Sequence, residues 1–421
     1  MTTPRRTNRV ACALLALALP AWAGCDLNSA LDVDAPTQIL ASSLDDPQKV
    51  PLLFSSVTAG FYCALGAYIV VSGEVSDLLA YVGGNALRDK YYARSLSSGL
   101  GFSNGYQNTG CNGADAIGAY GNLHETRWYA NDLVTKLEGW TDAEVAPANR
   151  VQTLARTAAI QGYAELLLGE GFCTMAFDNG PLVTRQEVFE RAEATFSKAI
   201  QQAQAAADAQ TLNLAYVGRA RARLNAGDAA GAASDAALVP ATGFLEATTQ
   251  SGTDPYRRNQ VFSLMQLQSL SSVETYWRGF THQGVVDPRV ALTQCLVPLE
   301  VWSFDKYPTI STPIPIARSE EAQLILAEVQ GGATAVTIIN QLHPPGMPAF
   351  SSSDPVEILA HVIEERAIVL FGEGHRLGDM LRYNLPFRPA AGSPGVGSNA
   401  VFGTDTCMPL PIEEVNNNPN L

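Results

Sequence analysis

The feature that most constrains the fold is a run of helical segments near the middle of the chain. Residues 185–207 place apolar side chains on one face of a helix, and Thr184 with Glu187 forms a capping box at its start. Residues 212–241 then read as two helices joined by an Asn-Ala-Gly-Asp turn at Gly227. A chain built from such consecutive helices is expected to fold as stacked helix pairs.

The segment 212–241 resembles one tetratricopeptide repeat, with small Ala220 and Ala232 where its two helices approach each other. A single repeat cannot bury its apolar face alone, so neighbouring helices should stack on it. The segments 149–206 and 317–343 are the expected partners. An ordinary antiparallel helix pair, without repeat character, is the alternative interpretation.

The remaining pattern predicts a mainly α fold with long irregular insertions. Residues 51–82 read as a buried helix and the start of a second helix, and the tail of the chain reads as a loop. Residues 83–121 are rich in glycine, and residues 242–316 are rich in proline without long periodicity. We expect these two stretches to form one loop-rich side of a helical scaffold. That scaffold is predicted over the ranges 51–82, 122–241 and 317–384.

The N-terminus has the three parts of an export signal. Arg5, Arg6 and Arg9 precede an apolar stretch over residues 10–24, and Cys25 follows small residues. The stretch is too short to span a bilayer as a helix. It resembles the lipobox of bacterial lipoproteins, although Trp22 departs from that pattern. We therefore expect a signal peptide at 1–24, a single domain at 25–421 and a lipid-modified Cys25, the alternative being a plain secreted protein.

Composition narrows the function classes. The net charge is −14 over 421 residues, which disfavours nucleic acid as a partner because phosphate binding needs clustered Lys and Arg. After the signal, no segment is expected to cross a membrane. No CxxC pair occurs, so we predict no metal site. Disulfides are compatible with export, but their connectivity is open among Cys63, Cys111, Cys173, Cys295 and Cys407.

The ordered motifs of the chain resemble a known family. They include LLLGEGFCTMAFDNGPLVTRQEVFERAEATFSKAIQQA (166–203), PIPIARSEEAQLILAEV (313–329), EERAIVLFGEGHRLGDMLRYN (364–384) and MPLPIEEVNNNPNL (408–421). Together with the lipoprotein start, they are similar to the SusD/RagB family. Ala367 and Ile368 depart from its charged helix pattern. The resemblance implies a tetratricopeptide-like helical fold in a surface-exposed outer-membrane lipoprotein. It also implies a glycan or peptide ligand, and a SusC-like TonB-dependent receptor as partner.

The charged residues of 364–382 are interpreted as structural. They alternate in sign around a helix pair and should form ion pairs that fix the last helices. Phe371 and Leu381 should face the core, and His375 should be a hydrogen-bonded structural residue rather than a metal ligand. No cofactor motif occurs in the chain.

A protein that binds sugars without cleaving them needs exposed aromatic platforms with amide or acid groups nearby. The predicted platforms are Tyr91, Tyr92, Tyr106 and Trp277, and Asn104 could supply hydrogen bonds. Trp302 is expected to pack a loop onto the scaffold. Trp128 is expected in the core, on a helical stripe.

Catalysis has weaker support in the sequence. Residues 101–105 match the G-x-S-x-G pattern, but their flanks are loop-like and no histidine is tied to Ser103. The chain also lacks HExxH and P-loop motifs. We therefore predict a binding protein rather than an enzyme. A lipid-anchored helical scaffold that binds proteins, with no nutrient ligand, is the alternative function.

Overall fold

The computed structural model describes residues 41–83, 90–96, 118–296, 300–394 and 401–421. By internal contacts the chain divides into residues 1–45 and residues 46–421. The described part of the first unit is a short 3₁₀ helix, η1 (Ala41–Leu44). All that follows concerns the second unit.

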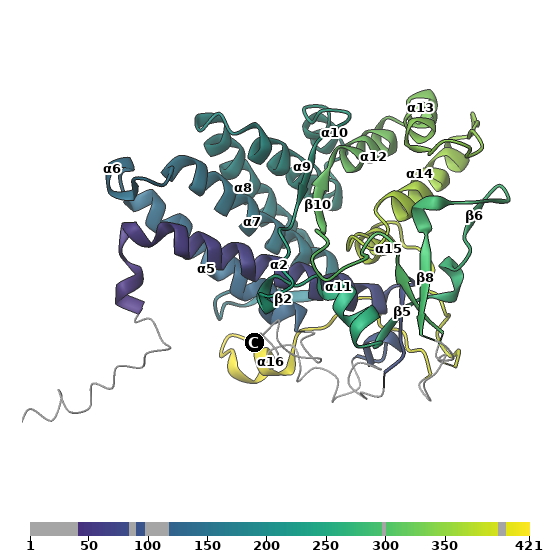
Figure 1. Ribbon diagram of the computed structural model, residues 1–421, viewed down its shortest axis with the longest axis horizontal. Coiled ribbons are helices and arrows are strands. Elements are labelled where there is room, and N and C mark those ends of the chain that lie inside the picture. The colour runs from purple at the N-terminus through teal and green to yellow at the C-terminus, as the bar shows by residue number, and fades with distance from the viewer. Residues whose placement is uncertain (1–40, 84–89, 97–117, 297–299, 395–400) are drawn as a thin grey trace, which may run out of the picture. The chain divides into compact units, whose positions relative to one another are not determined.

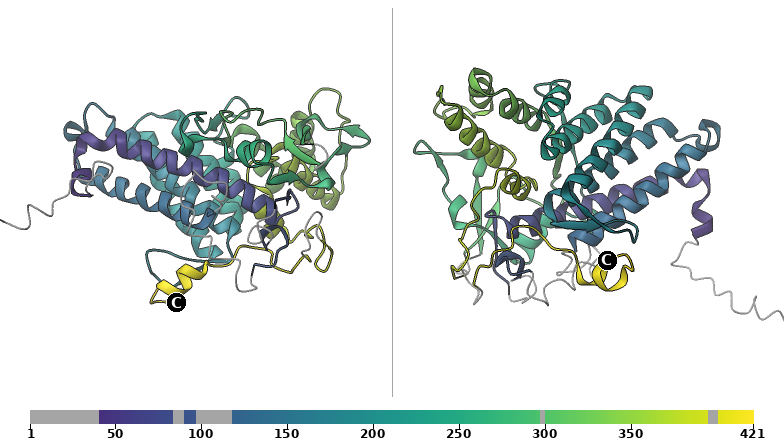
Figure 2. Two further views of the ribbon diagram at one scale, coloured as in Figure 1. Left: turned by 60° about the horizontal axis from the view of Figure 1, so that its bottom comes forward. Right: turned by 180° about the vertical axis from the view of Figure 1, so that it is seen from behind.

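A stack of long helices forms the first part of this unit. Its members are α2 (Val50–Val75), α5 (Ala119–Gly139), α7 (Arg150–Gly171), α8 (Arg185–Ala205), α9 (Ala209–Ala226) and α10 (Ala229–Ala236), with the short α6 (Asp142–Val145) between α5 and α7. Each of α5, α7, α8 and α9 packs on the next of these long helices along the chain (Figure 1). Helix α2 lies against both α5 and α7 (Figure 2). The prediction of consecutive helix pairs is confirmed.

Local chemistry explains where these helices begin and end. Thr184 and Glu187 form the predicted capping box at the start of α8. Gly227 closes α9 in the left-handed conformation, with φ of 89°, which a side chain would strain. In the middle of the stack, Phe196 of α8 fills the space left by Gly162 of α7 and Gly218 of α9. A Cβ atom at either glycine would lie within 2.8 Å of that ring.

A second group of helices continues the stack. Strand β10 (Pro315–Arg318) leads into α12, which packs on α9 and α10. Helices α12, α13 and α14 then pack on one another. The bounds are α12 (Ser319–Gln330), α13 (Gly332–Leu342), α14 (Pro355–Val369) and α15 (Arg376–Arg382).

Short strands and turns make up the insertion between α10 and β10. Within the described residues every sheet has two antiparallel strands, and no central parallel sheet is present. The pairs are β1 (Leu79–Tyr81) with β5 (Ser271–Val273), β2 (Thr174–Ala176) with β3 (Leu182–Thr184), β4 (Leu245–Ala247) with β10, β6 (Thr281–His282) with β7 (Val285–Val286), and β8 (Leu292–Leu296) with β9 (Val301–Phe304). The short helical turns are η2 (Pro47–Lys49), η3 (Pro255–Arg257), α11 (Gln260–Phe262), η4 (Ser263–Leu267), η5 (Thr275–Trp277) and η6 (Pro288–Val290).

Two local predictions are wrong. The second helix expected before residue 82 is strand β1, because Leu79–Tyr81 pairs with Ser271–Val273 of the distant insertion. The tail is not only loop, since α16 (Ile412–Asn417) forms near its end. Much of the glycine-rich stretch 83–121 lies outside the described residues.

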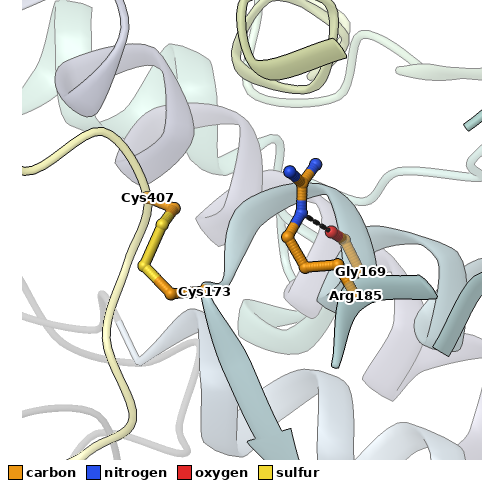
Figure 3. Close-up of a disulfide and its surroundings, with 4 residues drawn as sticks. All are labelled: Gly169, Cys173, Arg185 and Cys407. Carbon is orange, nitrogen blue, oxygen red and sulfur yellow. Dashed lines mark hydrogen bonds between the residues drawn. A yellow bond between two sulfur atoms is a disulfide. The ribbon is translucent and has the colours of Figure 1, made fainter. Parts of the chain in front are cut away.

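A disulfide ties the C-terminal segment to the end of α7. Cys173 bonds to Cys407, and the neighbouring residues Phe172 and Met408 form a β-bridge (Figure 3). Cys63 is also disulfide-bonded, whereas Cys295 is a free thiol. Disulfide formation agrees with the sequence-based expectation that an exported protein can carry such bonds.

Helix α2 is the most apolar element of the described chain. The segment Pro47–Val75 is long and apolar enough to cross a membrane by length and composition, contrary to the expectation that no such segment follows the signal. In the structure, 67% of its most apolar window is buried inside the protein. Its apolar character is therefore accounted for by its place in the core, against α5 and α7.

Candidate functional site

A cavity of about 430 Å³ opens between α2, α5 and η3. Helix α2 contributes mainly small side chains to its wall, helix α5 contributes polar and aromatic ones, and the third side is formed by the segment around η3. The lining residues are Ser55, Ser56, Ala59, Gly60, Cys63, Asn122, Glu125, Tyr129, Asp254 and Tyr256.

Helical spacing places these side chains together. On α5, Asn122, Glu125 and Tyr129 follow one another at intervals of three and four residues, so they share a face. Small residues on the facing part of α2 leave the cavity open. At Gly60 the two helices are close, since a Cβ atom there would lie 3.4 Å from Thr126 Oγ1.

Asn122 is the most unusual group in the wall. The residue is only 3% exposed, and both its side-chain amide nitrogen and oxygen are buried without a hydrogen-bond partner among the described residues. Leaving a buried polar group unpaired costs about 1–3 kcal/mol. The NH2 group can donate and the oxygen can accept hydrogen bonds, and a small movement of the wall would expose them to a molecule in the cavity.

Two tyrosines that line the same cavity have accessible rings. Tyr129 is 44% exposed and Tyr256 is 47% exposed. Asp254 caps the turn η3 by accepting a hydrogen bond from the Tyr256 backbone N–H at 3.0 Å, which fixes the approach of that segment. Exposed aromatic rings that share a cavity provide flat apolar surfaces for a ligand to stack on.

The electrostatics of the wall disfavour anionic ligands. Desolvation raises the pKa of Glu125, and a hydrogen bond with the Tyr129 hydroxyl partly opposes this change. Desolvation, followed by the Glu125 carboxylate, raises the pKa of Tyr129. The described lining contains two carboxylates and no Lys, Arg or His side chain. A neutral molecule rich in hydroxyl groups, with an apolar face, fits these groups best.

The comparisons with known proteins bear on the fold. No protein-family model matches the chain, and no curated protein matches it. Among solved structures, a SusD homolog from Bacteroides thetaiotaomicron VPI-5482 is similar over 90% of this chain and 98% of its own, with a TM-score of 0.66 and 12% identity. The chain has a SusD-like fold.

Two further solved structures agree with this assignment. A SusD superfamily protein from Bacteroides fragilis matches with a TM-score of 0.65 and 15% identity, over 89% of this chain and 99% of that protein. A laminarin-binding SusD-like protein matches with a TM-score of 0.61 and 14% identity, over 87% of this chain and 97% of that protein. The fold expected from the SusD/RagB resemblance is thereby confirmed.

Within this SusD-like fold, the three aromatic platforms that fall among the described residues are not accessible. Tyr91 is 5% exposed, Tyr92 is 1% exposed and Trp277 is 2% exposed. Tyr92 packs edge-on against Phe402, with ring centroids 5.0 Å apart. A ring buried in this way presents no face to a ligand, so the prediction of exposed platforms at these three positions is wrong.

Trp277 is held firmly by its neighbours. Its indole nitrogen donates a hydrogen bond to the Asp77 carbonyl at 2.8 Å, and its ring lies 5.2 Å from that of Phe371. Part of it borders a smaller cavity of about 140 Å³ that also involves Tyr276. Tyr106 and Asn104 lie outside the described residues, so their roles stay predictions.

The sequence does not reveal the cavity of the SusD-like fold, because its lining comes from separate segments, and one residue of α5 is placed wrongly. Trp128, expected in the core, is 53% exposed and stacks edge-on against Tyr129 with ring centroids 5.4 Å apart. Arg127 is buried instead and pairs with Asp178 at 2.5 Å. Trp128 and Tyr129 are both exposed, whereas the apolar stripe of α5 runs through Leu123, Ala130 and Val134.

Proposed function

We propose that this chain is a non-catalytic glycan-binding lipoprotein of the outer membrane and that the cavity between α2, α5 and η3 is its ligand site. The signal peptide ends at residue 24, Cys25 carries the lipid, and the protein faces the cell surface. It passes its ligand to a SusC-like TonB-dependent receptor. A peptide is the second ligand class that the SusD/RagB resemblance allows.

The observation that carries the proposal is that one cavity is lined by the unpaired amide of Asn122 and by two exposed tyrosine rings. Sugars combine flat apolar faces with rims of hydroxyl groups, so they can stack on Tyr129 and Tyr256 while a hydroxyl pairs with the amide. One solved structure with this fold is described as laminarin-binding. A neutral glucan such as laminarin is accordingly the first ligand to test.

The lipid anchor and the receptor partner are supported by two different observations. The lipobox-like start supports attachment of acyl chains at Cys25. The receptor follows from the resemblance to the SusD/RagB family. A pull-down from the native membrane through a C-terminal tag should recover a large β-barrel receptor, and recovery of soluble proteins alone would favour the protein-binding scaffold instead.

The binding test compares the two cavities. Purified protein is titrated by calorimetry with laminarin and a panel of neutral oligosaccharides, and with peptides as a second arm. Tyr129→Ala and Tyr256→Ala should each weaken glycan binding about tenfold or more, which corresponds to about 1.4 kcal/mol. Tyr276→Ala is the matched control, because it removes an exposed tyrosine that borders the smaller cavity.

Asn122→Ala provides a second arm of the same test. It removes the unpaired amide, so it should weaken glycan binding without lowering the stability of the unliganded protein. Loss of binding in Tyr276→Ala alone would move the site to the smaller cavity. If the protein binds peptides but no glycan, the ligand class is peptide rather than glycan. Release of reducing sugar during the titration would contradict a non-catalytic role.

A further inference from the structure

Three histidines from separate elements meet beside α14. His282 belongs to β6, His343 follows the end of α13, and His361 lies within α14. One nitrogen from each ring can be chosen so that all three atoms lie within 4.8 Å of one another. The outermost two, His282 and His361, are 79 positions apart in the sequence. The three histidines belong to no common motif, and only the fold brings them together.

In two of the rings, one nitrogen lies close to a carboxylate oxygen. His282 Nδ1 lies 3.3 Å from Glu364 Oε1, and His343 Nε2 lies 3.1 Å from Glu365 Oε1. Glu365 is in turn held by Arg289, whose guanidinium donates hydrogen bonds to its two oxygens at 2.7 and 3.1 Å. Histidines that bind metal commonly donate their other nitrogen to a carboxylate, which fixes the ring orientation.

Each ring also has a buried nitrogen without a hydrogen-bond partner among the described residues, although that of His361 lies 4.0 Å from Glu365 Oε1. The side chains of His282, His343 and His361 are 6%, 5% and 10% exposed. Among the described residues, no hydrogen-bond partner is present for Nε2 of His282, Nδ1 of His343 or Nε2 of His361. The His361 ring stacks on the Phe350 ring with centroids 4.0 Å apart, which fixes its orientation. This stacking gives none of the three nitrogens a hydrogen-bond partner.

We propose that the three histidines form a binding site for a divalent transition-metal ion, with zinc as the best fit. Neutral imidazoles suit Zn²⁺, whereas Mg²⁺ and Ca²⁺ prefer oxygen ligands. Around tetrahedral zinc, ligand nitrogens lie about 3.4 Å apart, so the rings close inward by about an ångström on binding. A water molecule completes the fourth position.

The ion would join three segments that otherwise meet only through side-chain contacts. It would pin the β6–β7 hairpin and the turn after α13 to α14. A metal that binds the folded state and not the unfolded chain raises the unfolding temperature by mass action. This role is independent of any ligand in the cavity between α2, α5 and η3, so either assignment can fail without the other.

The test uses protein free of a polyhistidine tag and stripped with a chelator. Titration with ZnCl₂ should show one ion per chain and a rise in unfolding temperature. His361→Gln and His282→Gln should each weaken zinc binding by about tenfold or more. His124→Phe is the control, because it removes a histidine of α5 outside the cluster, and it should bind zinc as the wild type does.

Cobalt offers a readout that needs no substitution. Co²⁺ added to the stripped wild-type protein should give the intense visible absorption of a four-coordinate site, and zinc should displace it. Absence of both zinc binding and this spectrum overturns the proposal. Zinc affinity unchanged in His361→Gln and His282→Gln, or lost in His124→Phe with its fold intact by circular dichroism, overturns it equally.

Discussion

Arg221 of α9 and Glu170 of α7 form a two-pronged ion pair inside the helical stack, with Nε donating to Oε1 at 2.7 Å and the side chains only 5% and 3% exposed. The same guanidinium lies 3.3 Å from His375 and 3.7 Å from Glu321 of α12. One buried cation therefore joins side chains from the early and late helices of the chain. The predicted structural, hydrogen-bonded role of His375 is confirmed.

Removal of this cation should strongly destabilise the fold. Arg221→Met leaves Glu170 as a buried charge without its main partner, and we expect the free energy of unfolding to fall by about 3–5 kcal/mol. Urea denaturation measures this change. Lys198→Met is the control, because it breaks an exposed pair with Glu138 and should change stability by less than about 1 kcal/mol. Equal losses in the two variants would contradict the assignment.

His124 should make the protein sensitive to acid. Burial, aided by Arg127 and Arg191, lowers the pKa of this histidine to about 3 from its ordinary value of 6.5. The folded state therefore keeps the ring neutral while the unfolded chain takes up a proton, and the stability present above pH 6.5 is lost as the pH falls toward 3.

His124→Phe removes this proton uptake and keeps a ring beside Tyr120 and Phe177. Relative to the wild type, the variant should gain stability as the pH falls from 6.5 to 4. Urea midpoints at several pH values measure the difference. Parallel stability curves for the two proteins would show that His124 does not titrate differently on unfolding.

The disulfide between Cys173 and Cys407 should contribute substantially to stability. The double variant Cys173→Ser and Cys407→Ser should lower the free energy of unfolding by about 2–5 kcal/mol, because the unfolded chain gains freedom when a long loop is opened. Thermal unfolding of the oxidised protein measures the loss. Cys295→Ser, which removes only the free thiol, should have little effect.

Lipid attachment at Cys25 is tested by fractionation. The wild-type protein should partition with membranes, and mass spectrometry should find acyl chains on the first mature residue. Cys25→Ala should release the protein or block its processing. Recovery of the wild-type protein only in the soluble fraction, without modification of Cys25, would refute the anchor.

Elements governed by local chemistry were predictable from sequence. The capping box at Thr184, the glycine turn at Gly227 and the helical stripe of α8 are where the pattern places them. The ion pairs expected among the last helices are also present, as with Arg366 and Asp379 at 3.0 Å. These features depend on neighbours within about a dozen residues or on strong pairing of opposite charges.

Features that depend on distant segments were not predictable. Tyr92 and Trp277 were expected at the surface because their surroundings lack periodicity, yet Phe402 and Phe371 cover them. The cavity needs α2, α5 and η3 together, and no single stretch of sequence describes it. The three clustered histidines show no metal-ligand spacing in the sequence for the same reason, since each comes from a different element.

The attachment of the C-terminal segment to α7 has a consequence for the order of assembly. Cys407 follows Cys173 by 234 residues, so this bond can form only after the intervening helices have been synthesised and delivered. The bridge from Phe172 to Met408 waits with it. The helical stack can begin to form before then, and the disulfide and the β-bridge later join it to a segment far along the chain.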